Sequence, residues 1–264
     1  AVLGAKPLAA LIKRTGGIDA RRDLPAFAPQ TFRAWFAARP APAEPAPNGP
    51  VLLWADTFTN AFSPEVGAAA VAVLEDAGYE VRLTDADVCC GLTWISTGQL
   101  DGARKQLTRS LDALAPALEG GFPIVGLEPS CTAVLRSDAH ELLPDDQRAA
   151  ALAPATKTLA ELLQATPGWS APSLAGVTGV AQPHCHQHAV MGFGPDQALL
   201  AGAGASITAI GGCCGLAGNF GVERGHYDVS VAVAENALLP AVRAADEDDV
   251  VLADGFSCRT QLDQ

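Results

Sequence analysis

The sequence predicts an α/β protein in which one plan of parallel strands and covering helices occurs twice. After residue 49, strand-length apolar segments alternate with helical segments, a pattern typical of parallel sheets. The triplet Cys-Cys-Gly appears twice, beginning at Cys89 and at Cys213. Cys131 follows the first triplet's leading cysteine by 42 residues, and Cys258 follows the second's by 45 residues. This shared order and near-equal spacing indicate an internal duplication.

Residues 1–48 are expected to form a short helical arm and a linker. Leu8 and Leu11 share one face of a first helical piece, and a second piece is expected around 31–37. The Pro/Ala-rich stretch 39–48 favours an extended linker and a domain boundary. The arm has too little apolar surface to fold alone, so we expect it to pack against another part of the protein.

The first half, residues 49–168, is expected to alternate strands with helices. Ser63-Pro64-Glu65 marks a helix start, because Ser caps the N-terminus, Pro suits the first turn and Glu suits its positive end. Gly78 is a suitable residue to end that helix. The predicted elements are a strand at 51–55, a helix at 63–78, a strand at 79–83, a helix at 100–118 and a strand at 122–127.

The second half, residues 169–264, repeats this alternation. Its predicted elements are a strand at 177–181, a helix at 195–203, a strand at 205–210, one long helix at 226–244 and a strand at 250–253. Strands connected through helices run parallel, and the helices cover both faces of the sheet. We therefore expect two Rossmann-like halves.

Composition excludes several classes of partner. The net charge of −12 and the pI near 4.7 do not attract a phosphate backbone, so nucleic acid is not expected. No stretch of about 18 apolar residues predicts a transmembrane segment. We expect a cytoplasmic protein, either free or peripherally attached to a membrane through its electron acceptor. The chain does not begin with Met, which indicates a fragment or a processed product.

The seven cysteines fall after predicted strands. The carboxyl ends of parallel strands form the ligand crevice of open α/β sheets, so each half should gather its cysteines at one edge. Neighbouring cysteines rarely form a disulfide with each other, because the peptide between them would be strained. Reduced cysteines that only fill a core remain an alternative. Packing alone, however, does not require a repeated triplet.

The second half offers a full set of four thiolates. Thiolates select zinc, copper(I) or iron–sulfur clusters. Two adjacent cysteines do not readily bind one tetrahedral ion, but they can bind different irons of a cluster, which favours iron–sulfur over zinc. The predicted metal ligands are Cys185, Cys213, Cys214 and Cys258.

The first half offers only three thiols. Asp56 and Glu128 stand where further cysteines would be expected. We therefore predict a degenerate site, either a weak carboxylate–thiolate metal site or a pocket without metal. Its candidate residues are Cys89, Cys90, Cys131, Glu128 and Asp56.

Histidines and an arginine flank the second set of cysteines. His184, His186 and His188 alternate around Cys185, and in an extended segment all three would lie on one side. They could be accessory ligands, proton carriers or substrate-binding groups, or simply parts of a polar loop. Arg259 could bind a carboxylate or balance cluster charge, or it could be an ordinary exposed arginine.

These residues resemble a known family, over about residues 50–264. The Cys-Cys-Gly layout is similar to the cysteine-rich domain of the heterodisulfide reductase and glycolate oxidase iron–sulfur subunits. A closer resemblance is to the C-terminal part of fused FAD-linked, iron–sulfur D-2-hydroxy acid dehydrogenases. Residues 1–38 resemble the tail of a helical ferredoxin-like domain. The stretches that carry the resemblance are 51–60, 127–131, 184–187, 212–218 and 253–259.

The resemblance implies a function in electron transfer or in completing an active site. It implies a four-iron cluster in the second half, with zinc or another metal as the alternative. It also implies an FAD-linked oxidase domain, a ferredoxin-type domain and a small 2-hydroxy acid substrate. We find no nucleotide- or flavin-binding motif in this chain, so FAD would lie in the partner domain. The chain alone is then expected to be inactive.

Two alternatives stay open. The chain could be a structural zinc-binding or subunit-interaction module without a redox role, and a homo-oligomer is compatible with that reading. It could also be a thiol redox module in which Cys213 and Cys214 cycle with a disulfide. The resemblance is incomplete, because the family pattern has five cysteines for each cluster and Gly255 stands in place of one of them.

Overall fold

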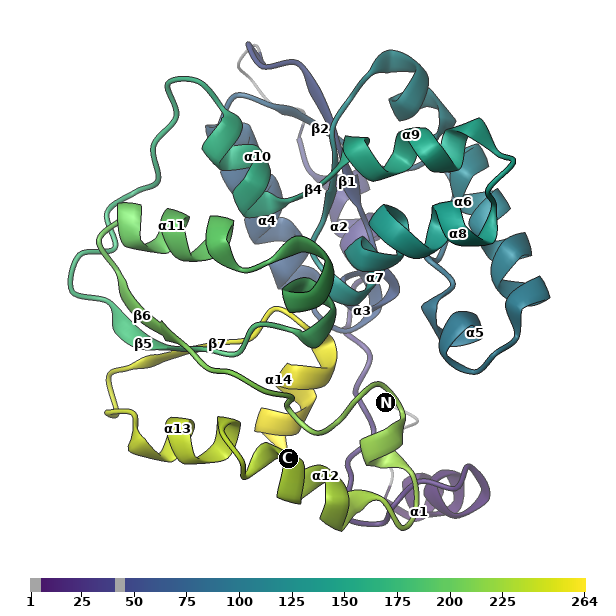
Figure 1. The fold of residues 1–264 in the computed structure, drawn as a ribbon, viewed down its shortest axis with the longest axis vertical. Coiled ribbons are helices and arrows are strands. Elements are labelled where there is room, and N and C mark those ends of the chain that lie inside the picture. The colour runs from purple at the N-terminus through teal and green to yellow at the C-terminus, as the bar shows by residue number, and fades with distance from the viewer. Residues whose placement is uncertain (1–5, 41–45) are drawn as a thin grey trace. The chain divides into compact units, whose positions relative to one another are not determined.

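The computed structural model describes residues 6–40 and 46–264, which divide into two compact units (Figure 1). The first unit consists of Ala28–Ala171, apart from 41–45, and His186–Leu199. The second consists of the described residues up to Phe27, Pro172–Cys185 and Leu200–Gln264. Each unit contains one parallel sheet with helices, so the predicted fold class of two parallel β/α halves is confirmed.

The sheet of the first unit has four parallel strands in the order β2-β1-β3-β4. Leu52 pairs with Arg82 on one side and with Ile124 on the other. The second strand, β2, is therefore added on one side of β1, and the third, β3, on the other side. This reversal of direction creates a topological switch point at the end of β1. The strands are β1 (Pro50–Trp54), β2 (Glu80–Arg82), β3 (Ile124–Gly126) and β4 (Thr156–Thr158).

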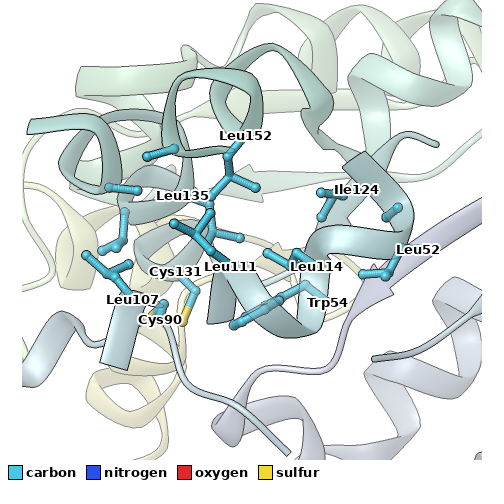
Figure 2. Close-up of a cluster of buried hydrophobic side chains, with 14 residues drawn as sticks. Leu52, Trp54, Cys90, Leu107, Leu111, Leu114, Ile124, Cys131, Leu135 and Leu152 are labelled. Atoms are coloured by element: carbon cyan, nitrogen blue, oxygen red, sulfur yellow. Dashed lines mark hydrogen bonds between the residues drawn. The ribbon is translucent and has the colours of Figure 1, made fainter. Parts of the chain in front are cut away.

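Helices cover both faces of this sheet. Val51 and Leu53 enter a buried cluster with residues of the helices α2 and α4, whereas Leu52 and Trp54 enter a second cluster with residues of α6. Figure 2 shows the second cluster, in which Cys90 and Cys131 lie side by side. The alternation explains why β1 is apolar throughout. The bounds of these helices are α2 Phe32–Ala38, α4 Pro64–Asp76 and α6 Leu100–Gly120.

Several short elements were not predicted. The strand β4 is polar, and α10 after it begins with a capping box in which Thr158 and Glu161 exchange hydrogen bonds. The others in the first unit are α3 Thr57–Ala61, α5 Leu92–Ser96, α7 Pro129–Ala133, η1 Val134–Asp138, α8 Ala139–Leu142, α9 Gln147–Ala155, α10 Leu159–Ala165 and η2 Gln187–Met191.

The sheet of the second unit has three parallel strands in the order β6-β5-β7. Its first strand lies in the middle, as β1 does in the order β2-β1-β3, so the duplication extends to the strand order. The other elements of the second half of the chain are β5 Thr178–Ala181, α11 Gly194–Gly202, β6 Ser206–Ala209, η3 Phe220–Val222, α12 Tyr227–Ala234, α13 Leu238–Ala244, β7 Val250–Leu252 and α14 Phe256–Asp263.

The prediction of one long helix over 226–244 is wrong. Two helices occur there, α12 and α13, and the chain breaks out of helical geometry at Ala237. Pro240 lies in the first turn of α13. Its ring would clash with a carbonyl one turn earlier in a continuous helix, whereas the first turn of a new helix accepts it.

The N-terminal arm contributes to both units. Helix α1 (Lys6–Thr15) precedes a segment that pairs with the second half, where Ile18 forms an antiparallel bridge with Glu223. Phe32 of α2 is buried against Gly67 in the first unit. Because the units are discontinuous in sequence, the boundaries 1–48, 49–168 and 169–264 stay a prediction. The linker 39–48 falls partly on 41–45, outside the described residues.

Among the described helices, none combines the length and apolar character that crossing a membrane requires.

Candidate metal centre

The three strands of the second unit end in loops that bring four thiols together. Cys185 follows β5, the pair Cys213-Cys214 follows β6, and Cys258 lies on α14 after β7. The thiols of Cys185 and Cys214 interact with that of Cys213 and lower its pKa. Cys214 in turn hydrogen-bonds with Cys258. The four predicted ligands therefore form an unbroken series of sulfur contacts, as expected from residues at the ends of parallel strands.

Gly215 shapes the second triplet. Its φ of +87° lies in the left-handed region that favours glycine. Its backbone N–H donates a hydrogen bond to Sγ of Cys213 at 3.3 Å. A Cβ at this position would overlap the carbonyl oxygen of Ser230 on α12. Both the turn and the close approach of α12 therefore require glycine next to Cys214.

The pKa values of two adjacent thiols in the second half, Cys213 and Cys214, are shifted in opposite directions. Hydrogen bonds from Cys185 and Cys214 hold the pKa of Cys213 well below its usual range, although partial burial opposes them. The bonds to Cys213 and Cys258, together with burial, raise the pKa of Cys214. These opposite shifts favour the thiolate form at Cys213 over that at Cys214, and thiolate is the form that binds a metal.

The first triplet repeats the same turn in a different setting. Gly91 has a φ of +83°. Its backbone N–H donates a hydrogen bond to Sγ of Cys89 over an N···S distance of 3.5 Å. The Sγ atoms of Cys90 and Cys131 are 2.9 Å apart, and both side chains belong to the apolar cluster of Figure 2. The local backbone is thus duplicated, but two of the thiols are packed into a core.

All three thiols of the first half have raised pKa values. Hydrogen bonding to Cys90 and then burial raise the pKa of Cys89, and hydrogen bonding to Cys131 and burial raise that of Cys90. The bond with Cys90 lowers the pKa of Cys131, but burial and two nearby carboxylates prevail and raise it to about 11. At neutral pH the metal-free first half therefore holds thiols rather than thiolates.

Those carboxylates belong to Asp56 and Glu128, and both act as helix N-caps. Asp56 accepts hydrogen bonds from the backbone N–H groups of Phe58 and Thr59 and from the Thr59 hydroxyl. Glu128 accepts from the N–H and hydroxyl of Ser130. Capping favours a buried carboxylate at a helix N-terminus. This role was not predicted, although Pro129 directly after Glu128 is typical of a helix start.

The three histidines do not share one side of an extended segment, and that prediction is wrong. The chain turns helical at Cys185 and continues into η2, so strand alternation does not apply. His184 is buried, and its Nε2 lies 3.2 Å from the Ser257 hydroxyl. His186 and His188 belong to the first unit. Of the three, only His184 lies in the unit that contains the four thiols.

Arg259 on α14 donates a hydrogen bond to the backbone carbonyl of Asp254 at 3.1 Å. Its guanidinium therefore helps to hold the loop that leads from β7 into α14. A role for Arg259 toward a carboxylate or a cluster stays a prediction.

Gly255 lies directly against the ring of His184. A Cβ at Gly255 would overlap Cδ2 of that ring, although the backbone φ of −71° suits any residue. The family pattern places a cysteine at this position, and the buried imidazole now fills the space where its side chain would begin. A side chain at position 255 is therefore incompatible with the present position of the His184 ring.

Replacing Gly255 with Ala should lower the free energy of unfolding of the metal-free chain by about 1–3 kcal/mol, a typical cost of overpacking. Chemical denaturation followed by circular dichroism measures this change. Gly211→Ala is the matched control, because a Cβ there meets nothing within 4 Å. The additional change His184→Ala should remove the cost specific to Gly255→Ala. Equal effects of Gly255→Ala with and without His184 would contradict the clash.

The donor set suits a soft metal centre, but it does not converge on one point. Within the described part of the chain, no group of three or more His, Cys, Asp or Glu side chains is placed to hold a single metal ion. A tetrahedral zinc ion needs four donors around one point, whereas each iron of a cluster takes its own protein sulfur. A series of thiol contacts therefore fits a cluster better than it fits one zinc ion.

One buried residue near the centre was also not predicted. The side chain of Arg22 is 1% exposed and bonds to Gly221 and Ser230, which flank the second triplet. Arg22 and Gly221 are separated by 199 residues. No local pattern in the sequence indicates this contact.

Comparison with known proteins identifies the class of domain. Residues 56–136 match a family described as a cysteine-rich domain, CCG. The matched range contains the first triplet and Cys131. This part of the chain is therefore similar to the Cys-Cys-Gly cysteine-rich domain, in agreement with the resemblance found in the sequence.

The chain is similar to a dehydrogenase subunit, to a dehydrogenase and to a lactate utilization protein. One subunit of the anaerobic glycerol-3-phosphate dehydrogenase of Escherichia coli (strain K12) is 28% identical over 98% of this chain, which spans 65% of that protein. D-2-hydroxyglutarate dehydrogenase of the same strain is 26% identical over 80% of the chain and 21% of its own length. Lactate utilization protein A of Bacillus velezensis is 28% identical over 74% of the chain and 87% of its own length. The chain thus spans less than two thirds of the first two relatives.

Proposed function

We propose that this chain is an electron-transferring part of a larger dehydrogenase, with one iron–sulfur cluster of the four-iron type. The observation that carries the proposal is the series of four thiols at the strand ends of the second unit. Similarity to dehydrogenase subunits supports it. The ligands would be Cys185, Cys213, Cys214 and Cys258.

The surrounding residues suit a redox centre. A bound cluster supplies the capacity to take up and release single electrons. Cys214 and Cys258 are buried, and they would keep water from one side of the centre, whereas Cys185 is exposed. The N–H of Gly215 donates to Sγ of Cys213, and hydrogen bonds to ligand sulfurs tune a reduction potential. Electrons would enter or leave on the side of Cys185.

The catalytic partner would be an FAD-linked D-2-hydroxy acid dehydrogenase, with flavin and ferredoxin-type clusters outside this chain. Two of the relatives are named for D-2-hydroxyglutarate and lactate, and the third for glycerol 3-phosphate. All three compounds are small, anionic and carry an oxidisable hydroxyl group. In this proposal the flavin oxidises the hydroxyl group, and this chain carries the electrons or completes the active site.

The first half would serve the fold rather than the chemistry. Its two carboxylates cap helices, and two of its three thiols lie in an apolar cluster. A second cluster there would bring further negative charge beside Asp56 and Glu128. The proposal is therefore one centre for each chain.

Reconstitution under anaerobic conditions tests the proposal. Purified chain treated with iron and sulfide should hold about four irons and about four acid-labile sulfides, and the reduced protein should give an electron paramagnetic resonance signal. Zinc should compete poorly. About one zinc per chain, with no iron or sulfide retained after reconstitution, would support the structural zinc alternative and overturn this proposal. About eight irons would contradict the assignment of a single centre.

A further inference from the structure

Arg22 is a buried cation that forms no ion pair with a carboxylate among the described residues. Its side chain is 1% exposed. Its Nε donates to the carbonyl oxygen of Gly221 at 2.8 Å, and one terminal nitrogen donates to the Ser230 hydroxyl at 2.7 Å. Both acceptors are neutral. Burying a charge is costly unless an opposite charge compensates it.

The carboxylate of Asp19 favours the charged form of Arg22 from a distance, but its hydrogen bonds go to Arg21. Arg21 donates to both carboxylate oxygens of Asp19, each at 2.9 Å, and a further bond joins Arg21 to Asp228. None of the ion pairs found among the described residues includes Arg22. The guanidinium also lies 4.7 Å from the centre of the Tyr227 ring, a cation–π contact that offsets part of the cost of burial.

The two acceptors of Arg22 pack close to Gly215, the last residue of the second triplet. A Cβ at Gly221 would lie 2.5 Å from the Ser230 hydroxyl and 3.0 Å from the carbonyl oxygen of Gly215, so the three groups pack closely. Gly215 directly follows Cys214. Arg22 is thus attached to the backbone that positions this thiol.

A further hydrogen bond extends the network to α14. The Ser230 hydroxyl lies 3.4 Å from Oε1 of Gln261, and Gln261 lies three residues after Cys258 on that helix. Ser230 and Gln261 are both buried. Burial lowers the pKa of Arg22, and the influences that oppose this are, from largest to smallest, Tyr227, Asp19 and Cys214. Arg22 therefore lies within electrostatic reach of the buried end of the thiol series.

We propose that Arg22 is a charge-compensating positioning residue, whose guanidinium balances the negative charge at Cys214 and Cys258 and raises the reduction potential of their centre. The inference rests on the proposed function. Reduction adds one negative charge to the centre, and a buried cation nearby stabilises the reduced form more than the oxidised form.

Redox titration of the reconstituted chain, followed by electron paramagnetic resonance, tests this role. Arg22→Gln removes the charge and keeps a donor for Gly221. We expect it to lower the ratio of reduced to oxidised centre at a fixed applied potential about tenfold, equivalent to about 59 mV for a one-electron couple. Arg22→Lys keeps the charge and should stay within about twofold of the unchanged chain. Arg21→Gln is the control, because its exposed charge is screened, and should leave the ratio unchanged.

Iron and sulfide contents separate the two ways in which the inference can fail. Unchanged chain without iron and sulfide would overturn the proposed function and the role of Arg22 with it. A full cluster in Arg22→Gln with an unchanged potential would overturn the role of Arg22 alone. Equal shifts in the Gln and Lys variants would also overturn it, since hydrogen bonding would then matter rather than charge. If Arg22→Gln fails to fold, the Arg22→Lys variant tests the inference instead. A large shift of the reduction potential in that variant, which keeps the positive charge, would contradict charge compensation by Arg22.

Discussion

Replacing Cys214 with Ser should leave the reconstituted chain with almost no iron or sulfide. Cys214 lies between Cys213 and Cys258 in the thiol series, so its loss interrupts the series at an interior position. A serine hydroxyl is a harder donor that stays protonated at neutral pH, and it does not replace a thiolate toward iron. Metal and sulfide analysis, with electron paramagnetic resonance of the reduced protein, measures the loss.

Cys90→Ser is the matched control. Cys90 holds the same place in the first triplet, is also buried and contacts Cys131 as Cys214 contacts Cys258. We expect its variant to keep the full iron and sulfide content. Loss of metal in Cys90→Ser but not in Cys214→Ser would reverse the assignment of the two halves. An undiminished centre in Cys214→Ser would exclude Cys214 as a ligand.

Replacing Gly215 with Ala should destabilise the metal-free chain by at least about 3 kcal/mol. A residue with a Cβ pays about 1–2 kcal/mol to adopt the left-handed conformation that this position requires. The added methyl group would also overlap the carbonyl oxygen of Ser230, which belongs to a helix backbone and cannot move alone. Chemical denaturation measures the free energy of unfolding, and amide hydrogen exchange in α12 reports where the structure loosens.

Gly91→Ala isolates the conformational part of that cost. Gly91 has nearly the same φ as Gly215, but a Cβ there would lie 3.5 Å from Cβ of Gln106, an ordinary contact. We expect a loss of only about 1–2 kcal/mol. Equal losses in the two variants would mean that α12 can move away from the triplet. The packing argument for Gly215 would then be wrong.

The sheets could be predicted because their strands are apolar runs of the correct length. Val51–Trp54 is buried on both faces of the sheet. A strand buried on both faces has a continuous apolar sequence, which makes it recognisable. The strand β4, residues Thr156–Thr158, is polar and has no such signal. Its backbone pairing with β3 makes it a strand. The break before α13 was predictable from Pro240, because proline does not fit the interior of a helix.

The site could be predicted only where it follows from topology. Strand ends gather residues that are far apart in sequence, so the meeting of the four thiols was accessible without coordinates. The arrangement of His184 and His186 was not, because it depends on where the chain after β5 turns helical. Arg22 was inaccessible for another reason: its partners lie in the last quarter of the chain, and a solitary arginine gives no sign that it is buried.

The helix caps of the first half have a consequence for how this duplicated chain can evolve. A thiol restored at the position of Asp56 would remove three hydrogen bonds from the start of α3, and loss of an N-cap costs about 1 kcal/mol. A cysteine at this position would bring the first half to four thiols, the number in the second half, but the loss of the cap would lower the stability of the chain whether or not a cluster formed. Under the proposed function, the two copies have become specialised, and the cap at Asp56 opposes a return of the first copy to metal binding.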